Sequence, residues 1–275
     1  MEDILANKQD KGGKKNMSFE KSKIVEKLKR DELVTCTKIN ITDMTVAEIA
    51  AWSGFDCIWL DMEHVPSDTE EIRAAMLAAK ARGAETIVRT KRGAYSNMIH
   101  SLEMDAAGVM VPHVMNLEDA KEVVYYTKFH PIGRRPLDGG NADGKYCMMD
   151  FDDYLKYSNE QKLTIIQIED VEAMEDLEEM AALEGVDMIF FGPGDFSQSI
   201  GCPGESNEEI EKARVRVAEV ARKHGKIAGT VGSAENLPHL YELGYRFVSM
   251  GADVIALGSY YKTILDKVKE FNEGR

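Results

Sequence analysis

The sequence predicts a (β/α)8 barrel, in which eight parallel strands alternate with helices. Short apolar segments rich in β-branched and aromatic residues alternate with longer amphipathic segments over about 240 residues. Eight such apolar segments are present, which is the number that closes this barrel. A doubly wound open sheet is the alternative fold. However, the first apolar segment and the residues after it, LVTCTKINITD, lack the glycine-rich phosphate-binding sequence that is usual there.

The predicted strands are short apolar runs, and the predicted helices have apolar residues at helical spacing, several of them ending at glycine. The strands span residues 33–39, 56–62, 85–90, 108–114, 163–169, 187–193, 226–231 and 246–251. The helices span residues 45–54, 69–83, 117–129, 171–183, 207–225 and 234–244, with a final helix over 259–275.

Composition limits the functions that the chain can have. Apolar residues make up 44% of the 275 residues, which is enough for a large core, and the formal net charge of −14 argues against nucleic acid or an anionic membrane as the main partner. Four scattered cysteines form neither a disulfide framework nor a zinc motif. No apolar run approaches the roughly 18 residues of a membrane span, and the start has no signal-peptide core, so we expect a cytoplasmic protein.

The predicted domain organisation is simple. Residues 1–17 are polar and rich in lysine and glycine, which predicts a flexible N-terminal tail, and residues 18–275 are expected to form one barrel domain. The connection over residues 129–161 is unusually long. Because it follows the fourth predicted strand, we expect it to overhang the carboxyl-terminal mouth of the barrel, where it would suit a substrate lid.

Polar residues collect where predicted strands end, which is where barrel enzymes carry their catalytic groups. Singly, each has a structural explanation as a turn, a cap or an ion pair, and we interpret His113 as a packed or solvated histidine without a role. Their coincidence at five strand ends favours a functional site. These residues are Asp61, Glu63 and His64, then Arg89, His113, Gln167, Glu169 and, in the sequence GPGDFS, Asp195.

Strand alternation sharpens the prediction for the fifth strand. Gln167 and Glu169 are two residues apart and share the inward face, so Ile166 and Ile168 face the helices. A buried Glu169 needs a cation or strong hydrogen bonds to stay ionised. Asp195 could supply a second carboxylate to the same metal, and such a pair with several waters suits Mg²⁺ or Mn²⁺ better than zinc.

With these residues assembled, the sequence resembles the metal-dependent (class II) pyruvate aldolases of the hydroxy-oxo-heptanedioate aldolase/citrate lyase family. The likeness runs from about Ser18 to Leu257. It is carried, in order, by the segments FDCIWLDMEH, IVRT, GVMVPHV, HPIGRR, IIQIED, EGVDMIFFGPGDFSQSIG and ELGYRFVSMGAD.

The resemblance implies a barrel of the phosphoenolpyruvate/pyruvate-binding type and a specific reaction. The enzyme would reversibly cleave a 2-keto-4-hydroxy acid, either a 2-keto-3-deoxy sugar acid or a 4-hydroxy-2-oxo-diacid, to pyruvate and an aldehyde through a metal-stabilised enolate. The resemblance also implies a divalent cation, Mg²⁺ or Mn²⁺ with Co²⁺ allowed, and a homo-oligomer for which a hexamer is the expected size.

The resemblance assigns the pyruvate half of the site to five positions. Glu169 and Asp195 would hold the metal. Gln167, with the backbone amides around Gly194 and Asp195, would bind the carboxylate of pyruvate. Arg89 would stabilise the enolate oxygen.

The resemblance assigns proton transfer to another group. His64 would be the base, acting through a water, and Asp61 and Glu63 would order metal-bound water. Glu103 occupies the place of a family aspartate that raises the basicity of the histidine. No lysine is expected among the inward strand-end residues, so a Schiff base is not predicted.

The sequence departs from the family pattern in ways that concern the aldehyde. Met62 stands where glycine is common, Gly194 where alanine is common, and the first strand, VTCTKI, lacks a frequent aromatic residue. Two alternatives therefore stay open. One is a lyase acting on a CoA ester of a β-hydroxy acid, with Arg134, Arg135 and Lys145 as the phosphate-binding patch. The other is a non-catalytic barrel that binds an α-keto acid.

Overall fold

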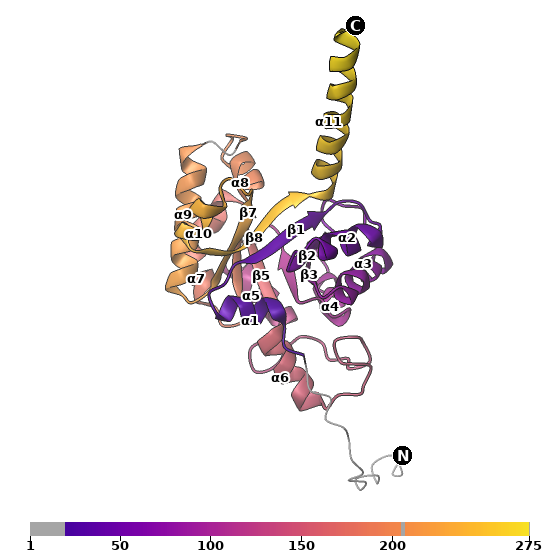
Figure 1. Cartoon of the computed structure of the whole chain (residues 1–275). Coiled ribbons are helices and arrows are strands. Elements are labelled where there is room, and N and C mark those ends of the chain that lie inside the picture. The colour runs from indigo at the N-terminus through magenta and orange to yellow at the C-terminus, as the bar shows by residue number, and fades with distance from the viewer. Residues whose placement is uncertain (1–19, 205–206, 275) are drawn as a thin grey trace, which may run out of the picture.

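The eight predicted strands form one closed parallel barrel, in the order β1 to β8, as seen in the computed structural model (Figure 1). The structure describes residues 20–204 and 207–274, so the predicted tail over residues 1–17 lies outside the described residues. The strands are β1 (Val34–Ile39), β2 (Cys57–Asp61), β3 (Glu85–Arg89), β4 (Gly108–Val111), β5 (Leu163–Ile168), β6 (Met188–Phe191), β7 (Ile227–Gly232) and β8 (Tyr245–Ala252). The barrel is confirmed, and the open sheet is wrong because β8 pairs with β1.

Helices surround the barrel, and four of those in the described residues were not predicted as such: α1, α4, α6 and α8. They are short or polar, so their apolar spacing is weak. The helices are α1 (Lys23–Lys29), α2 (Met44–Trp52), α3 (Thr69–Ala81), α4 (Ser96–Glu103), α5 (Leu117–Thr127), α6 (Phe151–Gln161), α7 (Leu177–Ala182), α8 (Pro193–Ser199), α9 (Glu208–Lys223), α10 (Leu237–Leu243) and α11 (Asp253–Glu273). The helix predicted over 171–183 is divided into a 3₁₀ turn, η1 (Val171–Met174), and α7.

The strand alternation expected for β5 is confirmed and explains how the polar layer is placed. Ile166 and Ile168 are buried against the surrounding helices. Inside the barrel, Trp59, Ile165 and Phe190 belong to one apolar cluster that fills the lower part of the ring. The next inward positions, toward the carboxyl ends of the strands, carry polar side chains. Apolar side chains therefore fill the barrel interior toward the amino-terminal ends of the strands, and the polar side chains lie at the carboxyl-terminal ends.

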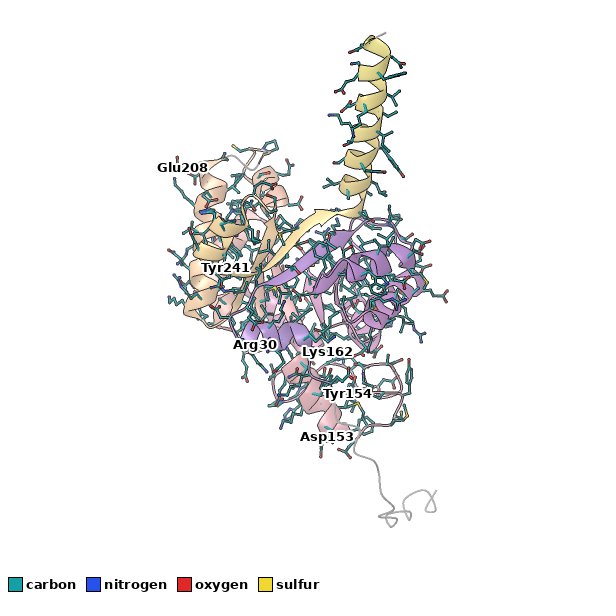
Figure 2. The ribbon with its side chains drawn as sticks, viewed as in Figure 1. Arg30, Asp153, Tyr154, Lys162, Glu208 and Tyr241 are labelled. Atoms are coloured by element: carbon teal, nitrogen blue, oxygen red, sulfur yellow. The ribbon has the colours of Figure 1, made fainter. Side chains whose placement is uncertain are left out.

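The long connection over residues 129–161 does not lie where we expected. It follows helix α5 and not strand β4 directly, so it belongs to the amino-terminal end of the barrel. Lys145 and Lys162 contact Asp105, which comes just before β4. Figure 1 shows α6 at the end of the barrel opposite α11, and Figure 2 shows Tyr154 and Lys162 in the same place. The predicted substrate lid is therefore wrong.

This connection is instead held to the bottom of the barrel by ion pairs to Asp105, of which the pair with Lys162 is buried. Asp105 binds Lys80, Lys145 and Lys162 at 2.5, 3.0 and 2.6 Å. Burial favours the neutral acid, but the three ammonium groups outweigh it and hold the pKa of Asp105 well below its usual range. One carboxylate thus fastens α3, the long connection and the start of β5 together.

Helix α11 leaves the barrel after β8 and points away from it (Figure 1). None of its residues is buried. In the described part of the chain, no helix is long and apolar enough to cross a membrane.

Replacing Asp105 by Asn should lower the free energy of unfolding by about 3 kcal/mol near neutral pH, because a buried ammonium loses its counter-charge. Asn suits the left-handed φ of 76° at this position, so the change tests charge alone. The folded-state pKa of Asp105 is depressed, so its stabilisation is present above about pH 5 and is lost as pH falls through the folded-state pKa. Urea unfolding from pH 7 to pH 3 should therefore show a constant difference between the two proteins down to about pH 4, which begins to narrow below that pH.

Lys80→Met is the matched control, since the Lys80 side chain is 61% exposed and should cost less than about 1 kcal/mol. A constant difference between wild type and Asp105→Asn across this pH range would contradict the ion-pair explanation.

Candidate active site at the carboxyl ends of the strands

A buried ion pair joins the ends of β2 and β3. Arg89 donates from Nε to Asp61 Oδ1 at 2.9 Å and from Nη2 to Asp61 Oδ2 at 2.7 Å. The guanidinium carbon lies 4.8 Å from the centre of the Trp59 ring, so the arginine is stacked as well as paired. Burial opposes ionisation of Asp61, but the hydrogen bonds and charges of Arg89 and Lys38 lower its pKa to about 2.

Asp61 has a second cation, which was not predicted. Lys38 Nζ lies 2.7 Å from Asp61 Oδ2. The expectation that no inward strand-end lysine exists is therefore wrong. The oxygens of Asp61 are bound by Arg89, Lys38 and the backbone N–H of Glu63, which donates to Oδ1 at 3.0 Å.

Glu63 and His64 both follow β2, but their side chains have different surroundings. Glu63 Oε2 lies 3.0 Å from Arg89 Nη1, and its other oxygen, Oε1, lies 3.4 Å from His113 Nε2. His64 is 52% exposed, and its Nε2 lies 3.6 Å from Glu63 Oε2. Glu63 thus points into the barrel mouth, whereas His64 lies at its solvent-facing edge.

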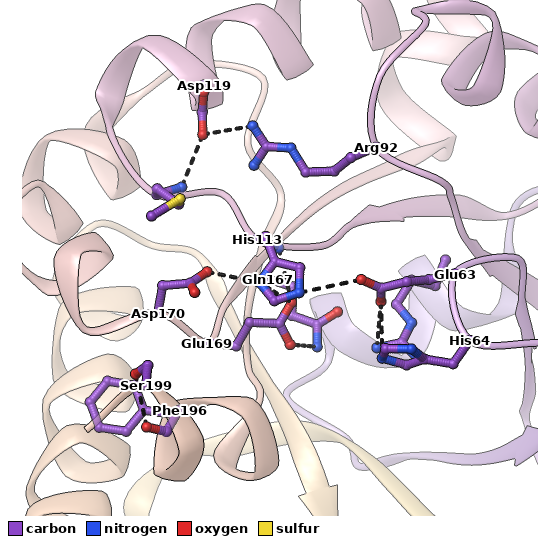
Figure 3. A network of polar contacts seen from close by, with 12 residues as sticks. Glu63, His64, Arg92, His113, Asp119, Gln167, Glu169, Asp170, Phe196 and Ser199 are labelled. Atoms are coloured by element: carbon purple, nitrogen blue, oxygen red, sulfur yellow. Dashed lines mark hydrogen bonds and ion pairs between the residues drawn. The ribbon is translucent and has the colours of Figure 1, made fainter. Parts of the chain in front are cut away.

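Glu169 is the centre of the polar network, which Figure 3 shows with its partners. It is fully buried. Oε1 accepts the backbone N–H of His113 at 2.9 Å, and Gln167 Nε2 donates to Oε2. His113 itself has a left-handed φ of 50°. The His113 ring is held by Asp170, whose Oδ2 lies 2.9 Å from Nδ1.

The electrostatics of this network favour a bound cation. Burial is the main cause that raises the pKa of Glu169 to about 7. The charges of Glu63 and Asp195 add to it, while the amide and ring of His113 oppose it. Burial lowers the pKa of His113, but Asp170 and the neighbouring glutamates outweigh burial and raise it. A divalent cation would relieve the repulsion among these carboxylates.

The residues present fit a divalent metal. Ligand atoms of Glu63, His113 and Glu169 all lie within 4.8 Å of one another. The side-chain carbonyl oxygen of Gln167 is buried without a hydrogen-bond partner in the described structure, so the pocket beside Glu169 has an acceptor to offer a ligand. Carboxylate and imidazole ligands suit several divalent cations. Glu63, expected to order water, is therefore a candidate ligand itself.

Asp195 and Gly194 lie in the first turn of α8, beside this cluster. The negative charge of Asp195 acts on Glu169, although Asp195 is not one of the three clustered side chains. The close approach of this turn depends on Gly192. A Cβ at Gly192 would lie 2.7 Å from Glu169 Oε2 and 2.9 Å from Gln167 Nε2.

Within one chain, Glu103 lies away from this site, so the role that we expected for it stays a prediction. It ends α4 at the amino-terminal end of the barrel, where its backbone carbonyl accepts the N–H of Asp143. Burial raises the pKa of Glu103, opposed by the charge of Arg135. His64 follows β2 at the opposite end.

Sequence reasoning missed the parts played by His113 and Lys38. The signal for His113 was its place after β4, next to the strand that carries Glu169. The signal for Lys38 was a charged residue inside an otherwise apolar predicted strand. Neither signal shows which side chains the residue meets, because that depends on the register of neighbouring strands. In this register Lys38 pairs with Trp59.

A (β/α)8 barrel with a candidate metal cluster and two cations at the carboxyl ends of its strands has the architecture of a metal-assisted enzyme. The chain belongs to the HpcH/HpaI aldolase/citrate lyase family, whose model matches residues 39–259.

Curated relatives and a solved structure agree with this assignment. A 2-dehydro-3,6-dideoxy-6-sulfogluconate aldolase of Pseudomonas putida is 32% identical over 88% of this chain and 95% of its own. A 4-hydroxy-2-oxo-heptane-1,7-dioate aldolase of Escherichia coli is 31% identical over 77% and 81%. The crystal structure of an HpcH/HpaI aldolase from Desulfitobacterium hafniense superposes with a TM-score of 0.84 at 26% identity, covering 89% of this chain and 96% of that one.

Replacing Gly192 by Ala should displace the Glu169 carboxylate and weaken binding of a divalent cation by at least about tenfold, a loss typical of disturbed metal sites. The φ of −101° at Gly192 is accessible to alanine, so the clash and not backbone strain is tested. Calorimetric titration with Mn²⁺ measures the effect.

Gly194→Ala is the matched control, because its Cβ would meet nothing within 4 Å and the change keeps the backbone amide. Equal Mn²⁺ affinity in the Gly192→Ala protein and the wild type would show that the cation does not bind at Glu169.

Proposed function

We propose that this protein is a metal-dependent aldolase that reversibly cleaves a 2-keto-4-hydroxy acid to pyruvate and an aldehyde. The observation that carries the proposal is the buried Glu169, with its pKa raised to about 7 among like charges, facing the fixed cation Arg89 across the barrel mouth. Such a site stabilises negative charge on a small chelating anion. The family and the names of its relatives support the reaction class.

The proposed cofactor is Mg²⁺ or Mn²⁺, with Co²⁺ also compatible with the ligands. Glu169 would hold it, together with Asp195 as the resemblance implies, and Glu63 and His113 are close enough to take part. When bound, the cation supplies Lewis-acid stabilisation of the charge that develops on the keto oxygen.

The side chains of this protein would perform the remaining steps. Gln167 and the backbone amides of Gly194 and Asp195 would bind the carboxylate of the keto acid. His64 would take the proton of the C4 hydroxyl, and the bond between C3 and C4 would break to release the aldehyde. The bonding electrons would enter the pyruvate enolate beside Arg89, and a proton added at C3 would complete pyruvate.

The lyase for CoA esters is a weaker proposal. The basic patch suggested for the CoA phosphates is at the other end of the barrel: Arg135 is buried against Asp143, and Lys145 binds Asp105. The non-catalytic barrel would not require a base at the mouth, so activity decides between it and the aldolase.

Wild-type protein should release pyruvate from at least one 2-keto-3-deoxy sugar acid or hydroxy-oxo-diacid, and EDTA should abolish the release, because the enolate charge then lacks its Lewis acid. His64→Ala should lose about 10²–10⁴-fold in kcat, the usual contribution of a general base, while still binding Mn²⁺. Glu169→Gln should lose both. Coupled pyruvate detection and calorimetry measure the two properties.

His113→Gln is the informative comparison, because it distinguishes the two histidines near the cluster. If His64→Ala turned over normally, and His113→Gln lost turnover while still binding Mn²⁺ with wild-type affinity, the base would be His113. Absence of metal-dependent pyruvate from every substrate in the panel would reject the aldolase.

We further propose that the protein is a homo-oligomer, with a hexamer as the expected size, in which α11 packs against another copy. Leu257, Tyr261, Ile264 and Val268 are 39–58% exposed and recur at spacings of four, three and four residues, which makes one apolar stripe along the helix. A stripe of this kind is costly to leave in water. The resemblance independently implies contacts between subunits at the end of the chain.

Ile264→Glu should shift the mass measured by size-exclusion chromatography with light scattering toward the monomer, because a charge would be buried in the interface. Lys262→Glu reverses a charge outside this stripe of α11 and should leave the mass unchanged. A wild-type protein that is monomeric at micromolar concentration would refute the proposal.

A further inference from the structure

We propose that a pocket on the outer side of β4, between helices α4 and α5, binds a zwitterionic α-amino acid with an aliphatic side chain, of the size of leucine. The pocket is separate from the candidate active site, and binding there does not depend on the reaction proposed for the barrel mouth.

The pocket lies between the loop that follows β3 and the first turns of α5. Its volume is about 200 Å³. A cavity needs only about 10–15 Å³ of such space to hold one water, so this pocket has room for a small metabolite.

The floor of the pocket is aliphatic. It is formed by Met98 of α4, Val111 of β4, and Val114 and Val123, the last from α5, and each is at most 6% exposed. The same four side chains belong to the core cluster that packs between the strands and the helices. The floor is therefore held in place by the fold, and an aliphatic side chain seated on it would lose contact with water.

Charged residues of both signs surround this floor. Lys91 and Arg92 come from the loop after β3, and Asp119 and Glu122 come from α5. Arg92 donates from Nη2 to Asp119 Oδ2 at 2.9 Å, so these two neutralise each other (Figure 3). Lys91 and Glu122 are exposed, and neither side chain has an ion-pair partner within the part of the chain that the structure describes. One cation and one anion are thus left for a ligand.

This balance of charges determines the class of ligand. A simple anion would be attracted by Lys91 but repelled by Glu122, and a simple cation would meet the opposite conflict. A zwitterion satisfies both residues: its carboxylate can accept from Lys91 and from the N–H groups of Arg92 that do not bind Asp119, and its ammonium can donate to Glu122. An α-amino acid carries both charges at one end and leaves its side chain for the floor.

The pocket and the candidate active site lie on opposite faces of β4. Val111 packs on the side of the helices, whereas its neighbour Met110 belongs to the apolar cluster inside the barrel. Glu169, the centre of the candidate metal cluster, lies on the inward side with Gln167. Binding of an amino acid in the pocket can therefore be measured with the metal removed.

Titration of the full-length protein with L-leucine in EDTA, followed by ligand-detected NMR, should give a dissociation constant near about 1 mM, as expected for so small a ligand. 4-Methylpentanoate lacks the ammonium and 3-methylbutylamine lacks the carboxylate. Each should bind at least about tenfold more weakly, because a charged hydrogen bond is lost. Equal affinity for leucine and either analogue would overturn the zwitterion, and no leucine binding at about 20 mM would overturn the site.

Lys91→Met and Glu122→Gln should each weaken leucine binding by at least about tenfold, and unchanged affinity in either variant overturns the proposal. The matched controls are Lys121→Met and Glu118→Gln, since these two residues of α5 pair with each other and do not line the pocket. Both should keep wild-type affinity for leucine. Glu169→Gln should keep it as well, and a loss there would place the leucine in the barrel mouth and reject the pocket.

Discussion

The buried carboxylate of Glu169 is the group on which the rest of the site depends. It lies at the end of β5 with no exposed surface, surrounded by a backbone amide, a side-chain amide and further acids. A carboxylate in such a place is unfavourable as an anion unless a cation joins it. Two neighbouring features accommodate this carboxylate. Gly192 has no side chain, so the next turn can approach, and the backbone N–H of His113 donates to Glu169.

The mouth of the barrel therefore divides into two electrostatic halves. On the side of β5 and β6, acidic side chains gather and favour a metal ion. On the side of β1 to β3, Lys38 and Arg89 share Asp61 and present positive charge above the Trp59 ring. The fixed positions of both halves come from strands, which are more rigid supports than loops.

The opposite end of the barrel is built for stability. Its long connection and α6 are fastened by Asp105 and by the buried pair of Arg135 and Asp143, far from the polar mouth. This separation is common in (β/α)8 barrels, where reactive groups sit at the carboxyl ends of the strands and stabilising contacts at the amino ends. Charged residues in the connection thus serve the fold, although in sequence they looked like a phosphate-binding patch.

The sequence by itself determined the eight strands, their inward and outward faces, and most of the polar residues at the mouth of the barrel. It could do so because alternation with period two is a local property of the chain. It also identified Glu169 as the buried acid. Only the tertiary structure decided the partners. Lys38 with Asp61, Glu63 with His113, and Glu103 with the far end of the barrel depend on strand register and on which end each connection occupies. Those relations join residues far apart in the chain, and no local pattern encodes them.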